Sequence, residues 1–540
     1  MVRTLSIVVW LLLIILPIGS GVLFLLLSSF HPQTVVNSAA LVNLLSEYES
    51  IVGSFMLAVV APLGACYLAL WMAPGLLQRP RLQQLLSPLL SIPHVSFAVG
   101  LMLLMSPSGW LIRLVDSVSG LFPSPPAGWP LPEKSLVTVM VVLVLKELPF
   151  LLLMISAQLK QLPVSSWLTQ AQSCGYSERQ AWWRIVAPEL LRRLTLPMAA
   201  VIIYSLSVVD IPLLVGSNTQ ALLAQRVYEW TFQFSTDSQV KSITGAWVLL
   251  AMAFVLLLIN TRHAAMYRCL VLCKKVNTRS AWWNSNKASQ YVWALLGILA
   301  LAIIVILALQ SLASHWFYPT LWPASLSLER WQTEGPYLAE PASYSFWLAL
   351  TSALFGTLAA IVLLQRQRQK AANAFYWPVL IALFIPQVPL ILGWQFVLRE
   401  PLSDGWQIGW VLWSHAVYTL PYSYLVLYGA YVRFDQQWLT RAQSLGYSAR
   451  EAWWRIMLPM LKQPIAVAFA VAFAVSIAQY LPTQWLGQGL TPTLTTEAVS
   501  VASGGDWRIG SLYALLQMLL PLVVFVAIGL IRTQSYAEHS

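Results

Sequence analysis

Long apolar stretches alternate along the chain with short polar segments that are rich in lysine and arginine. An apolar stretch of ~20 residues is long enough for an α-helix to cross a bilayer with its backbone groups hydrogen-bonded internally. Six stretches lie in each half of the chain: 5–29, 51–73, 85–105, 136–158, 195–215 and 243–261, then 291–313, 344–364, 375–398, 408–430, 464–484 and 510–531. The pattern predicts an all-α integral membrane protein with twelve transmembrane helices.

Composition supports a membrane protein. Hydrophobic residues make up 58% of the chain and charged residues 9%, whereas an ordinary soluble protein carries about 25% charged residues. So few charged side chains cannot cover the several domains that a soluble chain of 540 residues would form. The bilayer is therefore expected to surround most of the molecule.

The net charge of +11 is distributed unevenly along the chain. Most of the 31 lysine and arginine residues fall in alternate loops, on the side that also holds both termini. Because basic loops stay on the cytoplasmic side of a membrane, this asymmetry predicts cytoplasmic N- and C-termini. The same pattern accounts for the positive charge without a nucleic-acid partner, and we expect none.

The four cysteines, Cys66, Cys174, Cys269 and Cys273, do not form a disulfide framework, because Cys66 lies in an apolar stretch and the others lie in basic loops. Cys269 and Cys273 lie near His263, but their spacing is not that of a zinc site. We therefore expect free thiols and no bound metal.

A polar loop of the first half recurs in the second half. Residues 167–188 read WLTQAQSCGYSERQAWWRIVAP and residues 438–459 read WLTRAQSLGYSAREAWWRIMLP, identical at sixteen of twenty-two positions. Both copies follow the fourth span of their half, so the two halves have the same orientation, as in a parallel repeat about an axis along the membrane normal. Weaker matches pair Ile92-Pro93 with Ile385-Pro386 and Gly100 with Gly393.

The repeated loop has the pattern of two short helices joined by a tight turn. Gly175 can adopt the positive φ that such a turn needs, and Ser177 can cap the second helix. Pro188 is expected to end that helix before the next span, and small Ala171 would let another surface approach closely. The loop could instead be a simple anchor in the headgroup layer, but two near-copies of one cytoplasmic surface favour a twofold partner.

The loop resembles the EAA signature of permease subunits in binding-protein-dependent ABC importers: Glu-Ala-Ala, three residues, Gly, nine residues, then Ile-x-Leu-Pro. Both copies keep this spacing, although Thr169 and Thr440 replace the glutamate and Ala187 replaces the leucine. The fused layout resembles the thiamine and iron(III) importer group, and residues 476–489 and 493–505 look closest to an uncharacterised branch of it. The resemblance assigns ATPase contact to the loops through Ala171, Gly175, Ile185, Pro188, Ala442, Gly446, Ile456 and Pro459.

This resemblance implies a type I ABC importer permease with two parallel six-helix repeats. Residues 1–265 would form the first half, 266–289 a basic cytoplasmic linker and 290–540 the second half. An ATPase homodimer would bind the cytoplasmic face and a substrate-binding protein the periplasmic face of a bacterial inner membrane. The sequence has no Gly-Lys dipeptide for a Walker A loop. We expect the partner to use ATP, while this chain binds no cofactor, has no catalytic residue and is not an enzyme.

Polar side chains inside the predicted spans are candidates for a substrate path, because a charged group at the centre costs ~2.5–3.5 kcal/mol on insertion scales. Lys146 and Glu147 lie near the middle of the fourth span, and Asp210 lies in the fifth, which the resemblance places along the central path. The alternative for each is a buried hydrogen-bonded network that never contacts substrate. The candidates are Lys146, Glu147, Asp210, His415, Gln479 and Tyr480.

Some alternatives remain open at the level of sequence. His94 and Gln387 follow Pro93 and Pro386, where a broken helix could line a cavity, but a packing role is the simpler expectation for His94. The chain could also be a self-sufficient secondary transporter, although its strongest repeat would then be expected within the spans. Thiamine, iron(III) and a polyamine-like cation are all possible substrates.

Overall fold

The structure is a computed structural model. It describes residues 2–537 except for 32–35, 37, 80–81, 83–85, 87–88, 130–133, 218–219, 234, 274–284, 370–376 and 399–404. Its regular elements are helices, and the described residues add only one isolated β-bridge, between Ala313 and Leu326. The prediction of an all-α fold is confirmed. Residues 274–284 of the predicted linker 266–289 lie outside the described residues, and the division into 1–265 and 290–540 stays a prediction.

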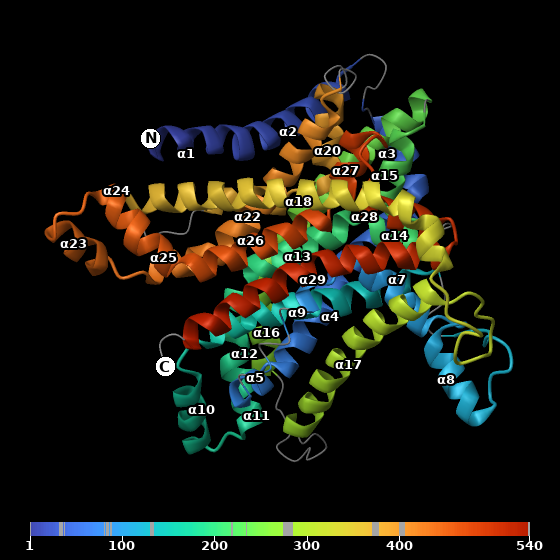
Figure 1. Ribbon diagram of the computed structural model, residues 1–540, viewed down its shortest axis with the longest axis horizontal. Helices are drawn as coiled ribbons and strands as arrows, with labels where there is room; N and C mark the ends of the chain where they lie inside the picture. The colour runs from blue at the N-terminus through green and yellow to red at the C-terminus, as the bar shows by residue number, and fades with distance from the viewer. Residues whose placement is uncertain are drawn as a thin grey trace.

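The first half contains long helices joined by shorter ones (Figure 1). They are α1 (Val2–Trp10), α2 (Leu16–Ser29), α3 (Ser38–Leu44), α4 (Tyr48–Met72), α5 (Pro74–Gln78), α7 (His94–Met105), α8 (Trp110–Ser119), α9 (Leu136–Leu159), α10 (Val164–Ser173), α11 (Glu178–Ala181), α12 (Ala187–Arg193), α13 (Thr195–Ser207), α14 (Asp210–Val215), α15 (Leu223–Thr231) and α16 (Thr236–Cys273).

The second half repeats this order. Its helices are α17 (Ser285–Leu312), α18 (Glu329–Gln369), α19 (Ile381–Phe384), α20 (Gln387–Val397), α22 (Gln407–Arg433), α23 (Gln437–Ser444), α24 (Ala449–Ala452), α25 (Leu458–Met460), α26 (Lys462–Ile477), α27 (Leu481–Gly487), α28 (Leu494–Ser503) and α29 (Trp507–Ala537).

Each of the twelve predicted spans coincides with a helix or a broken helix. Among the described residues, eight helices are long and apolar enough to cross a membrane, or up to ten if each of two bent pairs counts as one span. The other two predicted spans correspond to α13, which has 13 residues, and α22, which has 27 residues but carries more polar side chains.

The repeat extends beyond the loops that revealed it. The backbone amide of Leu223, at the start of α15, donates to the Ser54 hydroxyl on α4 over 2.8 Å. At the matching place in the second half, the amide of Leu494 on α28 donates to the Ser345 hydroxyl on α18, also over 2.8 Å. A serine on the second long helix of each half therefore caps the short helix that precedes the last span.

The first helix of each half packs against the other half. Helices α1 and α2 contact α18 and α20, whereas α17 contacts α4, α5 and α7 as well as α29 of its own half. In Figure 1, α1 and α2 accordingly lie beside α18 and α20, far from most of the first half. Sequence order alone did not predict this exchange.

Glycines permit both of these crossings. A Cβ on Gly393 of α20 would lie 1.9 Å from the Gly21 carbonyl oxygen of α2, and a Cβ on Gly100 of α7 would lie 2.5 Å from Ile303 Cγ2 of α17. Gly100 and Gly393 are the pair that matches between the two halves. Each repeat therefore uses the same glycine to receive the first helix of the other half.

Candidate functional site

Four interruptions of membrane helices meet at the centre of the molecule. Helices α7 and α20 begin directly after Pro93 and Pro386, and the segment before α20 is bent by 95° from it. The other interruptions separate α13 from α14 and α26 from α27. Residues from all four line one cavity of about 230 Å³. Irregular backbone at membrane depth is tolerated where it lines a cavity, so the arrangement suits a path for a polar solute.

Prolines explain two of these interruptions. Pro212 lies two residues into α14, and Pro482 is the second residue of α27. Proline has no amide hydrogen to donate one turn back and its ring clashes with the preceding turn, which favours a break near residues 208–209 and 478–480. Sequence reasoning did not use these two prolines, although they occupy corresponding places in the repeat.

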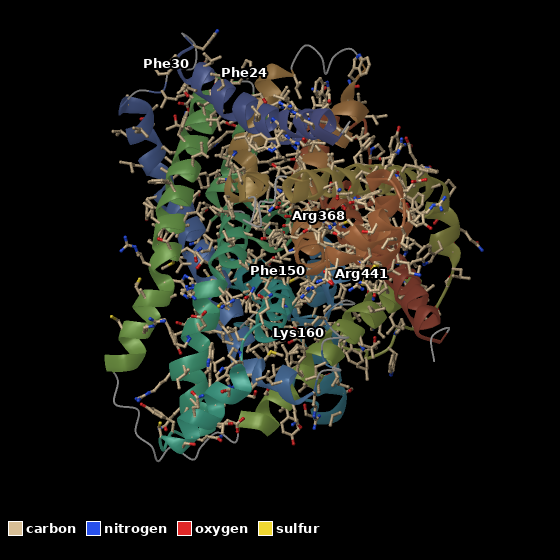
Figure 2. The ribbon with its side chains drawn as sticks, turned by 90° about the vertical axis from the view of Figure 1, so that its left-hand side faces the viewer. Phe24, Phe30, Phe150, Lys160, Arg368 and Arg441 are labelled. Carbon is tan, nitrogen blue, oxygen red and sulfur yellow. The ribbon has the colours of Figure 1, made fainter. Side chains whose placement is uncertain are left out.

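Five of the six predicted path residues line this cavity together: Lys146, Glu147, Asp210, Gln479 and Tyr480. His94 Nε2 lies 3.0 Å from Glu147 Oε1, and the His94 ring lies 4.7 Å from that of Tyr204. His94 and Gln387 also line the cavity, and the contacts of His94 with Glu147 and Tyr204 are compatible with the packing role expected for it. Phe150, another lining residue, lies near the centre of the molecule in Figure 2, whereas Phe24 and Phe30 lie at its edge.

His415 lies outside this group. Its Nδ1 lies 2.8 Å from the Ser476 hydroxyl and its Nε2 lies 2.9 Å from the Thr483 hydroxyl. Ser476 also accepts from Ser352 of α18 over 2.8 Å. His415 is thus held in a buried network that joins α22 to α26 and α27, which is the structural alternative considered for it.

Aromatic side chains adjoin the cavity at Tyr480, which is one of its lining residues. The Tyr228 hydroxyl of α15 lies 3.3 Å from that of Tyr480, and the Tyr228 ring stacks on Trp485 of α27 at 5.9 Å. In Figure 1, α15 and α27 lie at the end opposite α10 and α23. Tyr228 and the lining residues Tyr204 and Tyr422 were not predicted, because their spacing in the sequence resembles ordinary packing positions.

The two repeated loops have the same backbone. Gly175 has φ +82° and Gly446 has φ +91°, and each precedes a capping box in which Ser177 or Ser448 caps the following helix. A cation–π contact recurs as well: Arg184 lies over Tyr176 and Arg455 over Tyr447, at 5.8 and 5.7 Å. The predicted glycine turn and serine cap are confirmed by this geometry.

Two expectations about the loops are wrong. Ala171 and Ala442 are only 4% and 2% exposed, because they pack inside the turn, where their carbonyls accept from the amides of Tyr176 and Tyr447. They are not contact surface. Pro188 does not end its helix, since a π-helical stretch, Trp182–Val186, leads directly into α12. The wider π turn accommodates the missing proline amide, and the second loop does the same around Pro459.

One tryptophan in each loop attaches it to the membrane helices. Trp182 Nε1 donates to the Leu70 carbonyl of α4 over 3.1 Å, and Trp453 Nε1 donates to Gln365 Oε1 of α18 over 3.1 Å. Trp182 is buried against the membrane helices. Exposed apolar side chains remain at Ile185, Trp438, Leu445 and Trp454.

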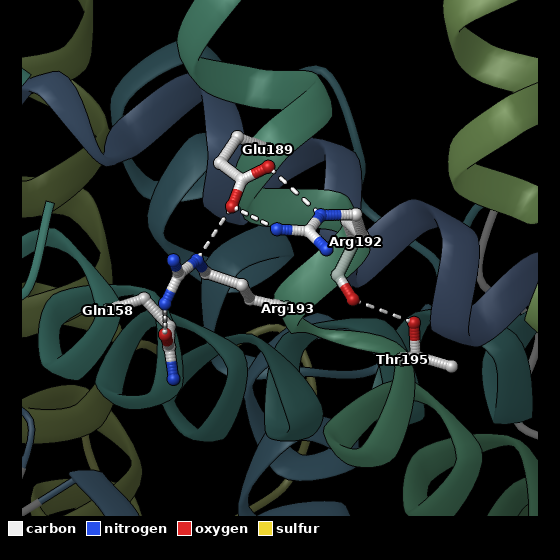
Figure 3. Close-up of polar contacts among 5 residues, drawn as sticks. All are labelled: Gln158, Glu189, Arg192, Arg193 and Thr195. Carbon is white, nitrogen blue, oxygen red and sulfur yellow. Dashed lines mark hydrogen bonds and ion pairs between the residues drawn. The ribbon is translucent and has the colours of Figure 1, made fainter.

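An acidic residue organises the end of the first loop (Figure 3). The Glu189 carboxylate accepts from Arg192 and from Arg193, each at 2.8 Å at its shortest, and Arg193 also donates to Gln158 of α9 over 3.4 Å. The hydrogen bond from Arg192, with a further contribution from Arg193, lowers the pKa of Glu189 from 4.5 to about 2. This cluster connects α12 to α9 at the loop end of the molecule.

The start of α1, the end of α29 and both loops lie at the same end of the molecule (Figure 1). Figure 2 views the molecule from that end, with Lys160, Arg368 and Arg441 labelled around its middle. This arrangement agrees with the predicted topology, in which the termini and the loops share one side of the membrane.

The sequence matches the family described as binding-protein-dependent transport system inner membrane component, over residues 65–271 and again over 352–534. It is 28% identical over 494 residues to the inner membrane ABC transporter permease protein YnjC of Escherichia coli, covering 89% of this chain and 88% of that protein.

Two further relatives match over shorter regions. The thiamine transport system permease protein ThiP of Escherichia coli is 26% identical over 245 residues, which cover 42% of this chain and 45% of ThiP. A homolog of the spermidine/putrescine transport system permease protein PotC from Mycoplasma genitalium is 30% identical over 141 residues. The match covers 26% of this chain and 48% of that protein. The family match spans most of this chain in two copies, so the chain belongs to the inner-membrane components of binding-protein-dependent transport systems, as a fused two-half ABC transport permease rather than an enzyme.

Proposed function

We propose that this chain forms the substrate path of an ABC importer and couples it to a separate ATPase dimer through its two repeated loops. The observation that carries the proposal is the recurrence of one loop geometry in both halves, with glycines at φ +82° and +91° and matching capping boxes. A dimer of identical ATPase subunits presents two identical surfaces, and two near-identical loops at one end of the permease are complementary to such a dimer.

The remaining parts of the proposal concern orientation and partners. The loop end, with both termini, would face the cytoplasm, where the ATPase would hydrolyse ATP. A periplasmic substrate-binding protein would deliver solute to the opposite end, where Tyr228 contacts Tyr480 of the cavity lining. The proposal includes contacts between the ATPase and the loop residues Gly175, Ile185, Gly446 and Ile456.

The proposed substrate is a cation, in the range from thiamine through iron(III) to a polyamine-like compound. Among the described residues that line the cavity, Glu147 and Asp210 carry carboxylates, whereas Lys146 carries the ammonium group. Relatives are named for thiamine and for spermidine/putrescine transport, which are organic cations. Because carboxylates outnumber ammonium groups among these residues, a positively charged solute is also proposed for this chain.

The test is affinity purification of the full chain in a mild detergent, with quantitative mass spectrometry of the proteins that accompany it. We expect an ATPase at two copies per permease. Changing Gly175→Val together with Gly446→Val should remove it, because a β-branched side chain is strained at positive φ. The matched control is Gly175→Asn with Gly446→Asn, since asparagine tolerates this conformation and should retain the ATPase.

Unfolding must be separated from loss of coupling. A Cβ added at either glycine would meet no other atom within 4 Å, so the valine variants should keep the elution profile of the wild-type membrane domain. A permease that purifies without any ATPase and moves solute along an ion gradient would contradict the proposal and support the secondary transporter instead.

A further inference from the structure

The acidic and basic side chains of the central cavity come from one half of the protein. His94, Lys146, Glu147 and Asp210 line it from α7, α9 and α14, whereas the lining residues described in the second half are uncharged. Gln387 takes the place that corresponds to His94. The cavity lies between two related halves, but the first half supplies the side chains that determine its electrostatic potential.

The two carboxylates in this cavity have different partners. Glu147 is 3.0 Å from His94 Nε2 and is preceded along the helix by Lys146. Asp210 is 7% exposed, and among the described residues no side chain donates a hydrogen bond to it; its hydrogen bonds come from backbone amides at residues 210 and 211, and His94 is close enough to act on it electrostatically. The His94 ring is held by Glu147, so the buried Asp210 carboxylate has no side-chain hydrogen-bond donor of its own among the described residues and favours the entry of a cation.

The rest of the lining restricts which cation fits. One carboxylate without a side-chain hydrogen-bond donor among the described residues matches one positive charge, and the Lys146 ammonium in the same cavity repels a second. Phe150, Tyr204 and Tyr422 add aromatic faces to a lining that is otherwise mainly aliphatic. Such a lining suits a ligand with an apolar or aromatic body.

We infer that Asp210 is the counter-ion for a monovalent organic cation with an apolar or aromatic body, and that Lys146 excludes multivalent cations from the same cavity. The inference rests on the proposed function, in which this cavity is the substrate path, and it narrows the substrate class to one kind of cation. It also assigns selectivity to the first half, with the second half contributing uncharged surface.

The test measures equilibrium binding of radiolabelled thiamine, a monovalent aromatic cation, and of spermidine, a trivalent aliphatic one, to the full chain in nanodiscs. We expect thiamine to bind more tightly than spermidine. Asp210→Asn should weaken thiamine binding by roughly tenfold to a hundredfold, the value of a charge-assisted hydrogen bond. Lys146→Met should strengthen spermidine binding by about tenfold without weakening thiamine, because it removes the repelling charge.

The control is Asp116→Asn, which removes a carboxylate of α8 outside this cavity and should change neither affinity. A gain of spermidine binding in Lys146→Met cannot result from misfolding, so it remains informative if Asp210→Asn is unstable. The inference is overturned if neither probe binds the wild type, if spermidine binds as tightly as thiamine, or if Lys146→Met leaves spermidine binding unchanged. ATPase co-purification is measured separately, so its loss would contradict the proposed function and not this assignment of charge.

Discussion

At the scale of single residues, the repeated glycines have two separate purposes. Gly175 and Gly446 provide positive φ in exposed turns, whereas Gly393 and Gly100 leave room for a crossing helix. The first purpose could be predicted, because a glycine between a short helix and a serine cap is a local pattern. The second could not, because the crossing partner lies hundreds of residues away and nothing in the local pattern identifies it.

Gly393→Ala should destabilise the membrane domain. Its Cβ would lie 1.9 Å from the Gly21 carbonyl oxygen, and backbone cannot move aside as a side chain can, so we expect a loss of about 1–3 kcal/mol, as for overpacking. Gly100→Ala should cost less, because it meets the Ile303 side chain. The melting temperature of each variant in detergent measures these losses. The control is Gly297→Ala, because an added Cβ there meets no neighbour within 4 Å. Equal melting temperatures for the Gly393 and Gly297 variants would contradict the tight crossing.

Glu189→Gln should change how stability depends on pH. The pKa of Glu189 is lowered from 4.5 to about 2 by its arginine partners, so its ionised form stabilises the fold above about pH 4.5, and this contribution is lost as pH falls towards about 2. The variant lacks the contribution, and its stability should fall less over that range. The effect is small because Arg192 is 65% exposed and solvent screens the pair.

Chemical unfolding of the first loop at several pH values provides the measurement for Glu189. The matched control is Glu178→Gln, which removes an exposed carboxylate that has no ion pair among the residues described here. Parallel pH profiles for wild type and Glu189→Gln would show that the arginine pairs contribute nothing.

At the scale of elements, the helices were more predictable than their interruptions. Bilayer thickness imposes a length of ~20 apolar residues, so all twelve stretches could be located from composition. Where those helices break depends on Pro93, Pro386, Pro212 and Pro482, and only the first two were recognised as possible breaks. Which polar side chains then reach the cavity depends on the tertiary arrangement. Lys146 and Asp210 line the cavity. His415 was equally apparent in the sequence, but both of its ring nitrogens lie within hydrogen-bond distance of buried hydroxyl groups instead.

The loops should depend on their tryptophan anchors to different degrees. Trp182→Phe leaves the buried Leu70 carbonyl without the indole donor and should cost about 1 kcal/mol. Trp453→Phe frees Gln365, whose half-exposed surroundings allow water to replace the indole, so its cost should be smaller. Limited proteolysis of each loop measures the local opening. Greater cleavage of the second loop than of the first in the respective variants would contradict this order.

At the scale of the whole molecule, the two halves are held together by exchanged helices as well as by one polypeptide. The contacts of α2 with α20 and of α17 with α7 do not require a continuous chain. Lipid tails are as apolar as the helix surfaces, so apolar pattern alone does not select a packing partner. That is why the sequence located every span but did not predict which half each first helix would join.

Separate expression of the two halves should reveal this exchange. We expect residues 1–273 and 285–540, co-expressed with an affinity tag on the first, to purify as a complex from mild detergent because each supplies a helix to the other. Gly393→Ala should lower the yield of the tagged complex more than Gly297→Ala does. Recovery of the first half alone, with both variants behaving alike, would show that the covalent connection is what holds the halves together.

The crossing of α2 over α20 also determines an order of events during synthesis. α2 enters the membrane first, but its partner helix begins only at Gln387, roughly 360 residues later, or on the order of half a minute of translation. Throughout that interval the face of α2 that will contact α20 can meet only lipid, insertion machinery, other proteins or the rest of the first half. The beginning of the chain therefore cannot reach its native place until α20 has been made, and the newly made first half is not a finished unit until the second half has been inserted.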